Sequence, residues 1–354
     1  MSTRRERPPF GARELVLLVA TLAIIGAVAE GVARLVWTDP SQPTRPIPPE
    51  WQGLPNVSGL WALAKPNVRG LASGALFETN SAGVRGGERT LAKPPGVFRI
   101  AIVGASIAMG MGVVEAETYA ARLERSLAAA HPERRFEVLN FGLSGLNAWS
   151  VVERLGRLAR PYDPDLIVYG YTLNDIEGPA YRRSVDFAFV DPRTHAGSPL
   201  TLWRLLGPRF ASLRELVWAP RGSYSFELDD NYFRNPEAWQ RVLEAFDRVR
   251  DLANERGICA VVFVHTRLYW LSRLHPYGRH YAAVVTAARE RGLAAIESFP
   301  AFRGESAQTL WIAPLDPHPN ARGHEILAGA LAAGLEALPP SCWELHGASS
   351  ARKR

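Results

Sequence analysis

Three side chains in the sequence have the types and positions needed for serine-based acyl transfer. Ser106 follows Gly104 and Ala105, directly after a short apolar run, while His318 and Asp316 lie far along the chain, just before a helical pattern. A serine hydroxyl becomes a nucleophile when a base takes its proton and a third group orients that base. The three side chains therefore predict a nucleophile (Ser106), a base (His318) and an acid (Asp316), provided that the fold brings them together.

Acyl transfer also needs hydrogen-bond donors where negative charge develops on the carbonyl oxygen. Two further segments after apolar runs offer such donors, at residues 140–147 and 171–175. We expect the backbone amides of Ser106 and Gly145 and the side-chain amide of Asn174 to form this oxyanion hole.

The elements that must position these residues alternate between strand and helix. Continuous apolar runs predict strands at 98–103, 136–141, 166–171, 259–264 and 293–296. Helical spacing of apolar residues predicts helices at about 117–130, 148–160, 236–256, 278–291 and 320–337. The alternation indicates the α/β class, with a mainly parallel five-stranded sheet between two layers of helices. Ligands of such sheets bind outside the carboxyl ends of the strands, which is where the candidate residues lie.

Four segments, in this order, resemble those of the SGNH or GDSL serine esterases and lipases. They are Gly104–Ser106 with Gly110, Asn140–Gly145, Leu173–Asp175 and Asp316–Asn320. Residues 79–85 also look like the lead-in of membrane-anchored bacterial members. The resemblance covers roughly residues 97–338 and implies a flavodoxin-like three-layer α/β/α sandwich.

The resemblance implies the same roles for the site residues as their chemistry does. It makes Ser106 the nucleophile and His318 the base, with Gly145 and Asn174 completing the oxyanion hole. The chain departs from the family pattern at Ala105, where the family has an aspartate. We expect this change to alter local hydrogen bonding more than the chemistry.

A second departure concerns the acid. The family places it three residues before the histidine, where this chain has Leu315, whereas Asp316 lies two residues before His318. Two alternatives are open: either Asp316 orients the imidazole, or a backbone carbonyl does so and the site is a Ser-His dyad. Of two other histidines, His324 lies within the last predicted helix and we interpret it as structural, whereas His265 follows the fourth predicted strand and is an alternative group of the site.

The amino-terminal region predicts a membrane helix at residues 14–37. Its apolar run from Leu15 to Ala29 follows four arginines. With the residues up to Trp37 it makes 23 residues, which at 1.5 Å each are long enough for a hydrocarbon core of about 30 Å. Basic residues before the span keep that end in the cytoplasm. The alternative is a signal peptide cleaved after Ala29, which would make the protein secreted. Either interpretation puts the rest of the chain outside the cytoplasm.

The remaining boundaries follow from composition. We expect a cytoplasmic basic tail (1–13), a proline-rich linker (38–60), a lead-in packing on the main domain (61–96), a hydrolase domain (97–338) and a carboxyl-terminal tail (339–354). An insertion at 176–235 interrupts the hydrolase domain and is far longer than an ordinary connection. Its many aromatic residues favour a cap or substrate wall beside the site, the alternative being a packing insertion without a role in chemistry.

Charge and cysteine content narrow the function further. The net charge of +6 comes from residues 1–13 and 352–354, so the body of the chain is about neutral and lacks the basic face that nucleic-acid binding needs. The chain has two cysteines, and we interpret Cys259, inside an apolar run, as a buried core residue. No cofactor or metal site is expected.

These observations together predict an extracytoplasmic serine esterase on the inner, cytoplasmic membrane, with its catalytic domain on the periplasmic side. We expect it to cleave carboxylic esters through an acyl-serine intermediate. The family resemblance, together with the expected anchoring, implies O-acetyl or other short acyl esters of envelope glycans or of a lipid. Its partners would be the ester substrate and the membrane. The alternatives are an O-acyltransferase acting on envelope glycans and a non-catalytic glycan-binding or assembly protein that keeps the fold.

Overall fold

The computed structural model of the 354-residue chain describes residues 11–36, 47–57, 63–178, 200–203, 206, 224–273, 275–313 and 316–345. The chain forms two units, one of residues 1–40 with 183–224 and a larger one of residues 41–182 with 225–354. Several predicted segments lie outside the described residues: most of the basic tail, much of the linker, most of the insertion, Leu315, and the end of the carboxyl-terminal tail.

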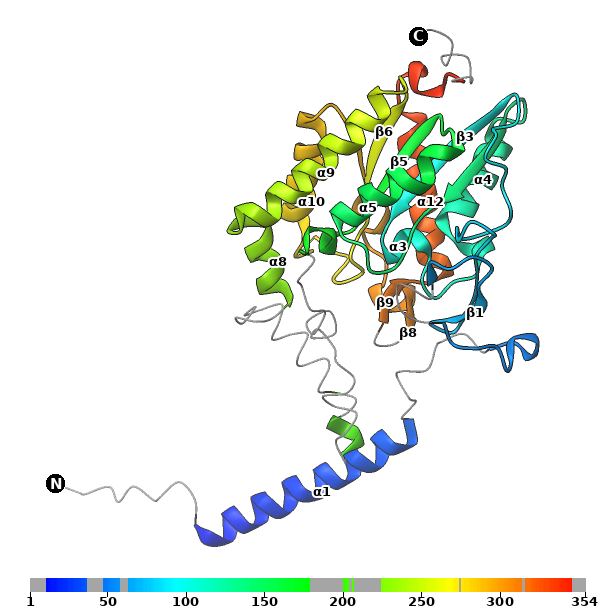
Figure 1. Cartoon of the computed structure of the whole chain (residues 1–354). Helices are drawn as coiled ribbons and strands as arrows, with labels where there is room; N and C mark the ends of the chain where they lie inside the picture. Colours follow the sequence, from blue (N-terminus) through cyan, green and yellow to red (C-terminus); the bar gives the residue numbers. More distant parts are fainter. Residues whose placement is uncertain are drawn as a thin grey trace, which may run out of the picture. The chain divides into compact units, whose positions relative to one another are not determined.

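A five-stranded parallel sheet forms the centre of the larger unit (Figure 1). Its strands are β3 (Val97–Gly104), β4 (Arg135–Asn140), β5 (Leu166–Tyr171), β6 (Cys259–Val264) and β7 (Ala294–Glu297). They are arranged in the order β4-β3-β5-β6-β7, and every neighbouring pair is parallel. This is the 2-1-3-4-5 order of flavodoxin-like sheets, in which the chain changes direction at the first strand. The predicted fold class is confirmed.

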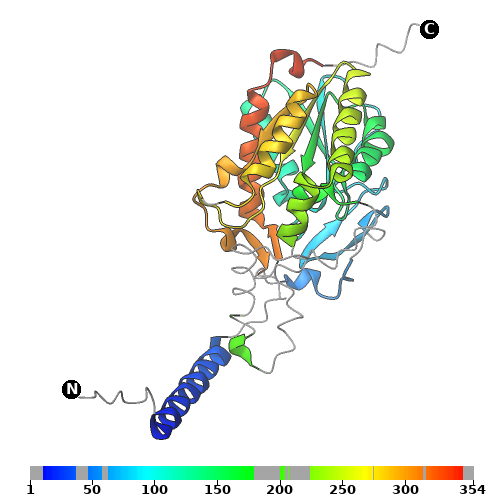
Figure 2. The same cartoon turned by 90° about the vertical axis from the view of Figure 1, so that its left-hand side faces the viewer.

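Helices cover both faces of this sheet (Figures 1 and 2). On one face α4 (Tyr119–Ala130) packs against α12 (Ala321–Glu336). On the other face α9 (Pro236–Asn254) contacts both α5 (Ala148–Arg154) and α10 (Gly278–Glu290). These helices form because apolar residues recur three and four positions apart, as on the buried face of α9 with Val242, Ala245, Phe246 and Val249.

Shorter elements surround the sheet. The lead-in contributes the antiparallel pair β1 (Arg69–Ala72) and β2 (Ala75–Glu78), and a second antiparallel pair consists of β8 (Trp311–Ala313) and β9 (Asp316–Pro319). Three short helices are α3 (Ser106–Met109), α8 (Tyr224–Phe233) and α11 (Phe299–Phe302). A π-helical turn at Leu155–Ala159 continues α5, and 3-10 turns lie at Pro49–Trp51, Glu115–Glu117, Arg160–Tyr162, Leu173–Ile176, Ala307–Leu310 and Pro340–Trp343.

The smaller unit contains helix α1 (Ala12–Val36). An 18-residue stretch within Arg13–Leu35 has a mean hydropathy of 2.4, and the segment is long and apolar enough to cross a membrane. Most of its described side chains are exposed.

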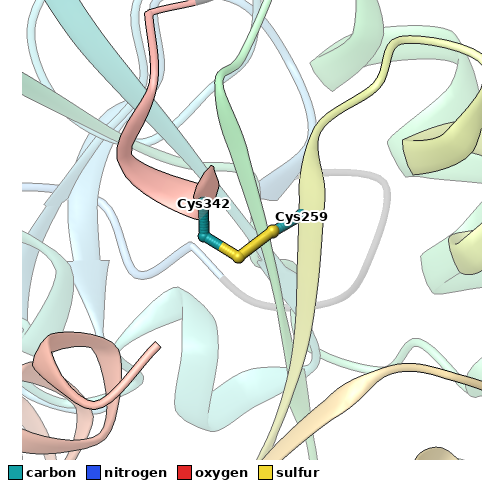
Figure 3. The surroundings of a disulfide bond; sticks show 2 residues. All are labelled: Cys259 and Cys342. Carbon is teal, nitrogen blue, oxygen red and sulfur yellow. A yellow bond between two sulfur atoms is a disulfide. The ribbon is translucent and has the colours of Figure 1, made fainter. Parts of the chain in front are cut away.

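A disulfide joins Cys259 at the start of β6 to Cys342 in the last 3-10 turn, with their Cα atoms 5.3 Å apart (Figure 3). Cys259 is half-buried and disulfide-bonded, so its interpretation as a buried core residue was wrong. The two cysteines are 83 residues apart in the sequence. They meet because α12 returns the chain from the carboxyl edge of the sheet to its amino edge, which sequence spacing alone does not indicate.

Candidate active site

The candidate nucleophile lies in the tight turn that follows β3. Gly104 ends the strand, and Ser106 begins α3. A Cβ atom on Gly104 would lie 2.4 Å from the carbonyl oxygen of Gly170 and 2.8 Å from the Cβ of Ala108. Only glycine fits this close approach of β3, β5 and α3, and the turn presents Ser106 at the carboxyl edge of the sheet.

Ser106, His318 and Asp316 form one chain of hydrogen bonds. The Nε2 atom of His318 lies 2.8 Å from the Oγ atom of Ser106, and its Nδ1 atom lies 2.5 Å from Oδ1 of Asp316. A carboxylate only accepts hydrogen bonds, so Nδ1 carries the proton and Nε2 of the neutral imidazole accepts from the serine hydroxyl. The acid, base and nucleophile predicted from the sequence are thus in contact.

The strand geometry of β9 explains how an acid two residues before the histidine reaches it. Side chains two positions apart in a strand project from the same face, so Asp316 and His318 point the same way. The backbone amide of His318 also donates to Oδ1 of Asp316, at 3.1 Å, which fixes the carboxylate beside the ring. Orientation of His318 by Asp316, rather than by a backbone carbonyl, is the arrangement in the structure.

The negative charge on Asp316 is stabilised by its hydrogen bonds with His318. Burial raises the pKa of the Asp316 carboxyl, but the neighbouring imidazole of His318, together with hydrogen bonds from its ring and its backbone amide, outweighs that effect and holds the pKa below its ordinary value. A carboxylate that stays ionised stabilises an imidazolium when the histidine takes up a proton. The side chains of Asp316 and His318 are about 30 % exposed, so the pair is accessible to a substrate.

The predicted oxyanion donors lie at the ends of three neighbouring strands. Ser106 follows β3, Gly145 follows β4 on one side of it, and Asn174 follows β5 on the other. In a parallel sheet these ends share one edge, so the two loops flank the serine. Gly145 and Asn174 are both half-buried.

The loop that carries Gly145 is held against the serine turn. The amide of Leu143 donates to the carbonyl of Gly104, at 3.0 Å, and the amide of Ser144 lies 3.4 Å from the sulfur of Met109. A Cβ atom on Gly142 would lie 2.3 Å from the backbone nitrogen of Met109, so this glycine lets the two backbones touch. These contacts fix the loop next to α3.

The turn that carries Asn174 is held by a tyrosine of α8. The Tyr232 hydroxyl donates to the carbonyl of Leu173, at 3.0 Å, and lies 2.6 Å from the hydroxyl of Tyr171. Tyr232 belongs to the part of the insertion that packs on the main domain, where Tyr224, Leu228 and Tyr232 form the buried face of α8. This contact was not predicted, because no short motif links positions so far apart in the sequence.

Two buried polar groups support the same turn from below. His265 Nδ1 lies 3.2 Å from the Thr172 hydroxyl, and the Asp175 carboxyl accepts from the hydroxyl of Tyr169, at 2.9 Å. Burial lowers the pKa of His265 to about 3 and raises the pKa of Asp175 to about 8, so both are neutral at pH 7. Neither is placed as the base of the site.

His324 is also buried, and its Nδ1 atom accepts from the backbone amide of Tyr119, at 3.2 Å. Burial lowers its pKa well below the ordinary value. Because a histidine that stays neutral in the core holds the start of α4, we assign it a structural part, as expected from the sequence.

Arg85 of the lead-in is a supporting residue that sequence reasoning did not single out. Its guanidinium donates to the carbonyls of Met109 and Gly110, both at 2.6 Å, and to that of Val113. It also pairs with Glu115 at 3.0 Å. Because the buried Arg85 binds three carbonyls, it fixes the segment after α3, and the lead-in thereby helps to hold the serine turn. The resemblance of residues 79–85 to the lead-in of membrane-anchored family members is the sequence signal that could have found it.

Among the described residues, no group of three or more histidine, cysteine, aspartate or glutamate side chains is arranged to hold a metal ion. The site consists of the hydroxyl, imidazole, carboxylate and amide groups described above, which suit nucleophilic attack on an ester carbonyl.

Comparison with known proteins relates the segment that carries these site residues to a known family. The model of the GDSL-like Lipase/Acylhydrolase family matches residues 102–326, more than half of the chain. That range contains Ser106, Gly145, Asn174, Asp316 and His318. No curated protein sequence matches the chain significantly.

Solved structures with a similar fold are distant in sequence. A two-domain esterase active on acetylated mannans, co-crystallised with mannopentaose, has 15% identity and a TM-score of 0.41, with 71% of this chain and 51% of that chain covered. The chain therefore spans about half the length of that esterase. LAE5, an α/β hydrolase from the metagenome of Lake Arreo, Spain, has 18% identity and a TM-score of 0.43, with 68% and 96% covered. The acetylxylan esterase Axe2 from Geobacillus stearothermophilus has 16% identity and a TM-score of 0.39, with 68% and 95% covered.

Proposed function

Because the chain belongs to the GDSL-like lipase/acylhydrolase family, we propose that it is a serine esterase whose nucleophile is Ser106. The observation that carries the proposal is the continuous hydrogen-bonded chain from Asp316 through His318 to Ser106. An ester hydrolase needs this series of hydrogen bonds because an unassisted serine hydroxyl is a weak nucleophile at neutral pH.

In the first half of the reaction, Ser106 Oγ attacks the carbonyl carbon of the ester while His318 Nε2 takes its proton. The imidazolium that forms is stabilised by the carboxylate of Asp316. Negative charge moves to the carbonyl oxygen, which the amides of Ser106 and Gly145 and the side chain of Asn174 stabilise. Collapse of this intermediate breaks the bond to the alcohol, which leaves with the proton from Nε2.

In the second half, water attacks the acyl-serine carbonyl and gives its proton to His318 Nε2. Collapse releases the carboxylic acid and returns the proton to Ser106 Oγ. A sugar hydroxyl in place of water would give acyl transfer with the same proton movements. Hydrolysis is our first proposal because the family is one of hydrolases, and transfer is the alternative.

We place the enzyme outside the cytoplasm, held at the inner membrane by α1. The apolar segment Arg13–Leu35 and the arginines that precede it support this location. The disulfide between Cys259 and Cys342 also supports it, because disulfides persist in oxidising compartments such as the periplasm. From this location we propose short acyl esters, such as O-acetyl groups on envelope glycans or lipids, as the substrate class.

A fluorophosphonate probe tests the nucleophile directly. The purified full-length protein should become labelled, and Ser106→Ala should abolish labelling. Ser150→Ala, a half-buried serine at the start of α5, is the matched control and should label like the wild type. A folded wild-type protein that neither reacts with the probe nor hydrolyses short aryl esters would favour the non-catalytic binding or assembly role instead.

A second experiment distinguishes hydrolysis from acyl transfer. An acetylated oligosaccharide should release free acetate when incubated with the enzyme. Recovery of the acetyl group on an added non-acetylated oligosaccharide, in place of free acetate, would show that acyl transfer is the reaction. Loss of both products in Ser106→Ala would tie either outcome to the proposed site.

A further inference from the structure

Glu30 is a charged residue within the apolar segment of α1, and its carboxylate is fully engaged. One oxygen accepts from the backbone amide of Thr201 and the other from that of Leu202, both at 2.8 Å. The guanidinium of Arg34 donates to the first oxygen, also at 2.8 Å. Two of these three donors belong to the part of the insertion, residues 183–224, that lies with α1 in the smaller unit.

The contact covers a distinct face of α1. Among the described side chains of this helix, Ala33 alone is buried, at 3% exposure, and Ala29 and Glu30 are half-buried. Residues three or four positions apart share a helix face. Both views show the short green helical segment of the insertion beside the carboxyl-terminal end of α1 (Figures 1 and 2).

The depth of Glu30 in the membrane follows from its position in the helix. It precedes Leu35, the end of the apolar segment, by five residues, which is roughly 7.5 Å along the helix axis. A carboxylate at that depth is costly unless it has partners. Since the amides of Thr201 and Leu202 are those partners, they lie at the same depth, just inside the boundary between headgroups and hydrocarbon.

The side chains next to these amides suit that boundary. Leu200 and Trp203 are 54% and 48% exposed, whereas Thr201 is buried. Leu200 and Trp203 are three positions apart across a helical turn, so they project to the same side. Tryptophan is enriched at the headgroup level of bilayers.

We propose that residues 200–203 are a membrane-contacting element: Glu30 holds this segment at the outer surface of the bilayer, where Leu200 and Trp203 contact lipid. This inference rests on the proposed anchored location. It ties the insertion to the membrane and requires that α1 be retained, because cleavage after Ala29 would remove the apolar part of α1 that precedes Glu30 and crosses the membrane.

Lipid contact can be measured at single cysteines. The two native cysteines form a disulfide, so Trp203→Cys supplies one thiol for an environment-sensitive fluorophore. The full-length protein is placed in phosphatidylethanolamine and phosphatidylglycerol vesicles that contain lipids with a quencher near the headgroup. We expect blue-shifted emission and at least a twofold loss of intensity. Leu91→Cys, 56% exposed in the larger unit, is the matched control and should be quenched little.

Glu30→Ala tests the docking of residues 200–203 onto α1 separately from the anchoring of α1 in the membrane. This variant should remain in the vesicles after an alkaline carbonate wash, while quenching at position 203 falls toward that of the control. Equal, weak quenching at positions 203 and 91 in protein that resists the wash would overturn the docking but leave the anchor intact. Extraction of the wild type by the wash would overturn the anchored location, and the docking with it. Hydrolysis of a soluble aryl ester, measured in parallel, tests the esterase independently.

Discussion

The carboxylate of Asp316 lies 2.5 Å from Nδ1 of His318, although one residue separates them in the chain. In a loop, so short a spacing would give no fixed relation between the two side chains. In β9 it places both on one face, and the second hydrogen bond from the amide of His318 fixes the carboxylate. The alternation of a strand thus replaces the longer spacing that is typical of the family.

Asp316→Asn should lower kcat strongly. An asparagine of the same size can donate to Nδ1, which favours the wrong imidazole tautomer and removes the charge that stabilises the imidazolium; the same change costs about 10⁴ in kcat in a well-studied serine protease. We expect a loss of at least about 100-fold with little change in KM. Steady-state hydrolysis of an aryl ester measures it, with the exposed Glu325→Gln as control. A loss below threefold would mean that the site works as a Ser-His dyad.

The central fold was predictable because its signals are local. Each strand of the sheet, such as β5, is a continuous apolar run, and each long helix, such as α9, repeats apolar residues at helical spacing. The serine turn and the residues 316–318 were also evident, because their types and order carry the chemistry.

The contacts that hold the site were not predictable in the same way. The disulfide of Cys259 with Cys342, the hydrogen bond from Tyr232 to Leu173 and the carbonyls bound by Arg85 all join segments that meet only in the folded chain. Nothing in the local sequence of either partner specifies the other. Whether Asp316 reached His318 likewise depended on the backbone conformation of β9, and no apolar pattern in that short segment predicts a strand.

The two histidines near the site should behave differently when replaced. His318→Ala removes the proposed base, so kcat should fall by at least about 10³-fold while the protein remains folded. His324→Asn keeps an acceptor for the amide of Tyr119 and should change kcat per folded molecule less than threefold, although it lowers the melting temperature. Active-site titration and circular dichroism separate the two effects. Equal losses of kcat would show that the base is wrongly assigned.

Tyr232→Phe should weaken catalysis without unfolding the protein. The ring remains in the core, but the carbonyl of Leu173 loses its donor and the turn that carries Asn174 is less well fixed. Removing an oxyanion donor costs about 10²- to 10³-fold in kcat, so we expect the displacement of one to cost about tenfold, with KM nearly unchanged. Tyr171→Phe is the matched control: it removes the neighbouring hydroxyl but leaves the bond to Leu173 and should cost less. Equal effects of the two variants would contradict a special role of Tyr232.

The disulfide should stabilise the fold without affecting the chemistry. It joins the amino end of β6 to the carboxyl-terminal turn, at the edge of the sheet opposite Ser106. Replacing both Cys259 and Cys342 by serine should lower the free energy of unfolding by about 2–4 kcal/mol, because the open chain gains entropy when unfolded. Urea titration measures this loss, and the reduced wild type should match the variant. A kcat that falls more than twofold in the folded variant would show that the two edges are coupled.

The neutral carboxyl of Asp175 should make stability depend on pH. Burial raises its pKa from 3.8 to about 8, so between these values the folded protein holds a proton that the unfolded chain has lost. The unfolding free energy therefore falls as pH rises from about 4 to about 8, by at most about 1.4 kcal/mol per pH unit from this group, and levels off above. Asp175→Asn removes the titration but keeps an acceptor for the hydroxyl of Tyr169. Its unfolding free energy, from urea titrations at pH 5, 6, 7 and 8, should lose this part of the slope, whereas the exposed Glu153→Gln should retain it. Parallel slopes in wild type and Asp175→Asn would mean that the carboxyl is ionised in the folded protein, and that the turn carrying Asn174 rests on a charge rather than on a neutral hydrogen bond.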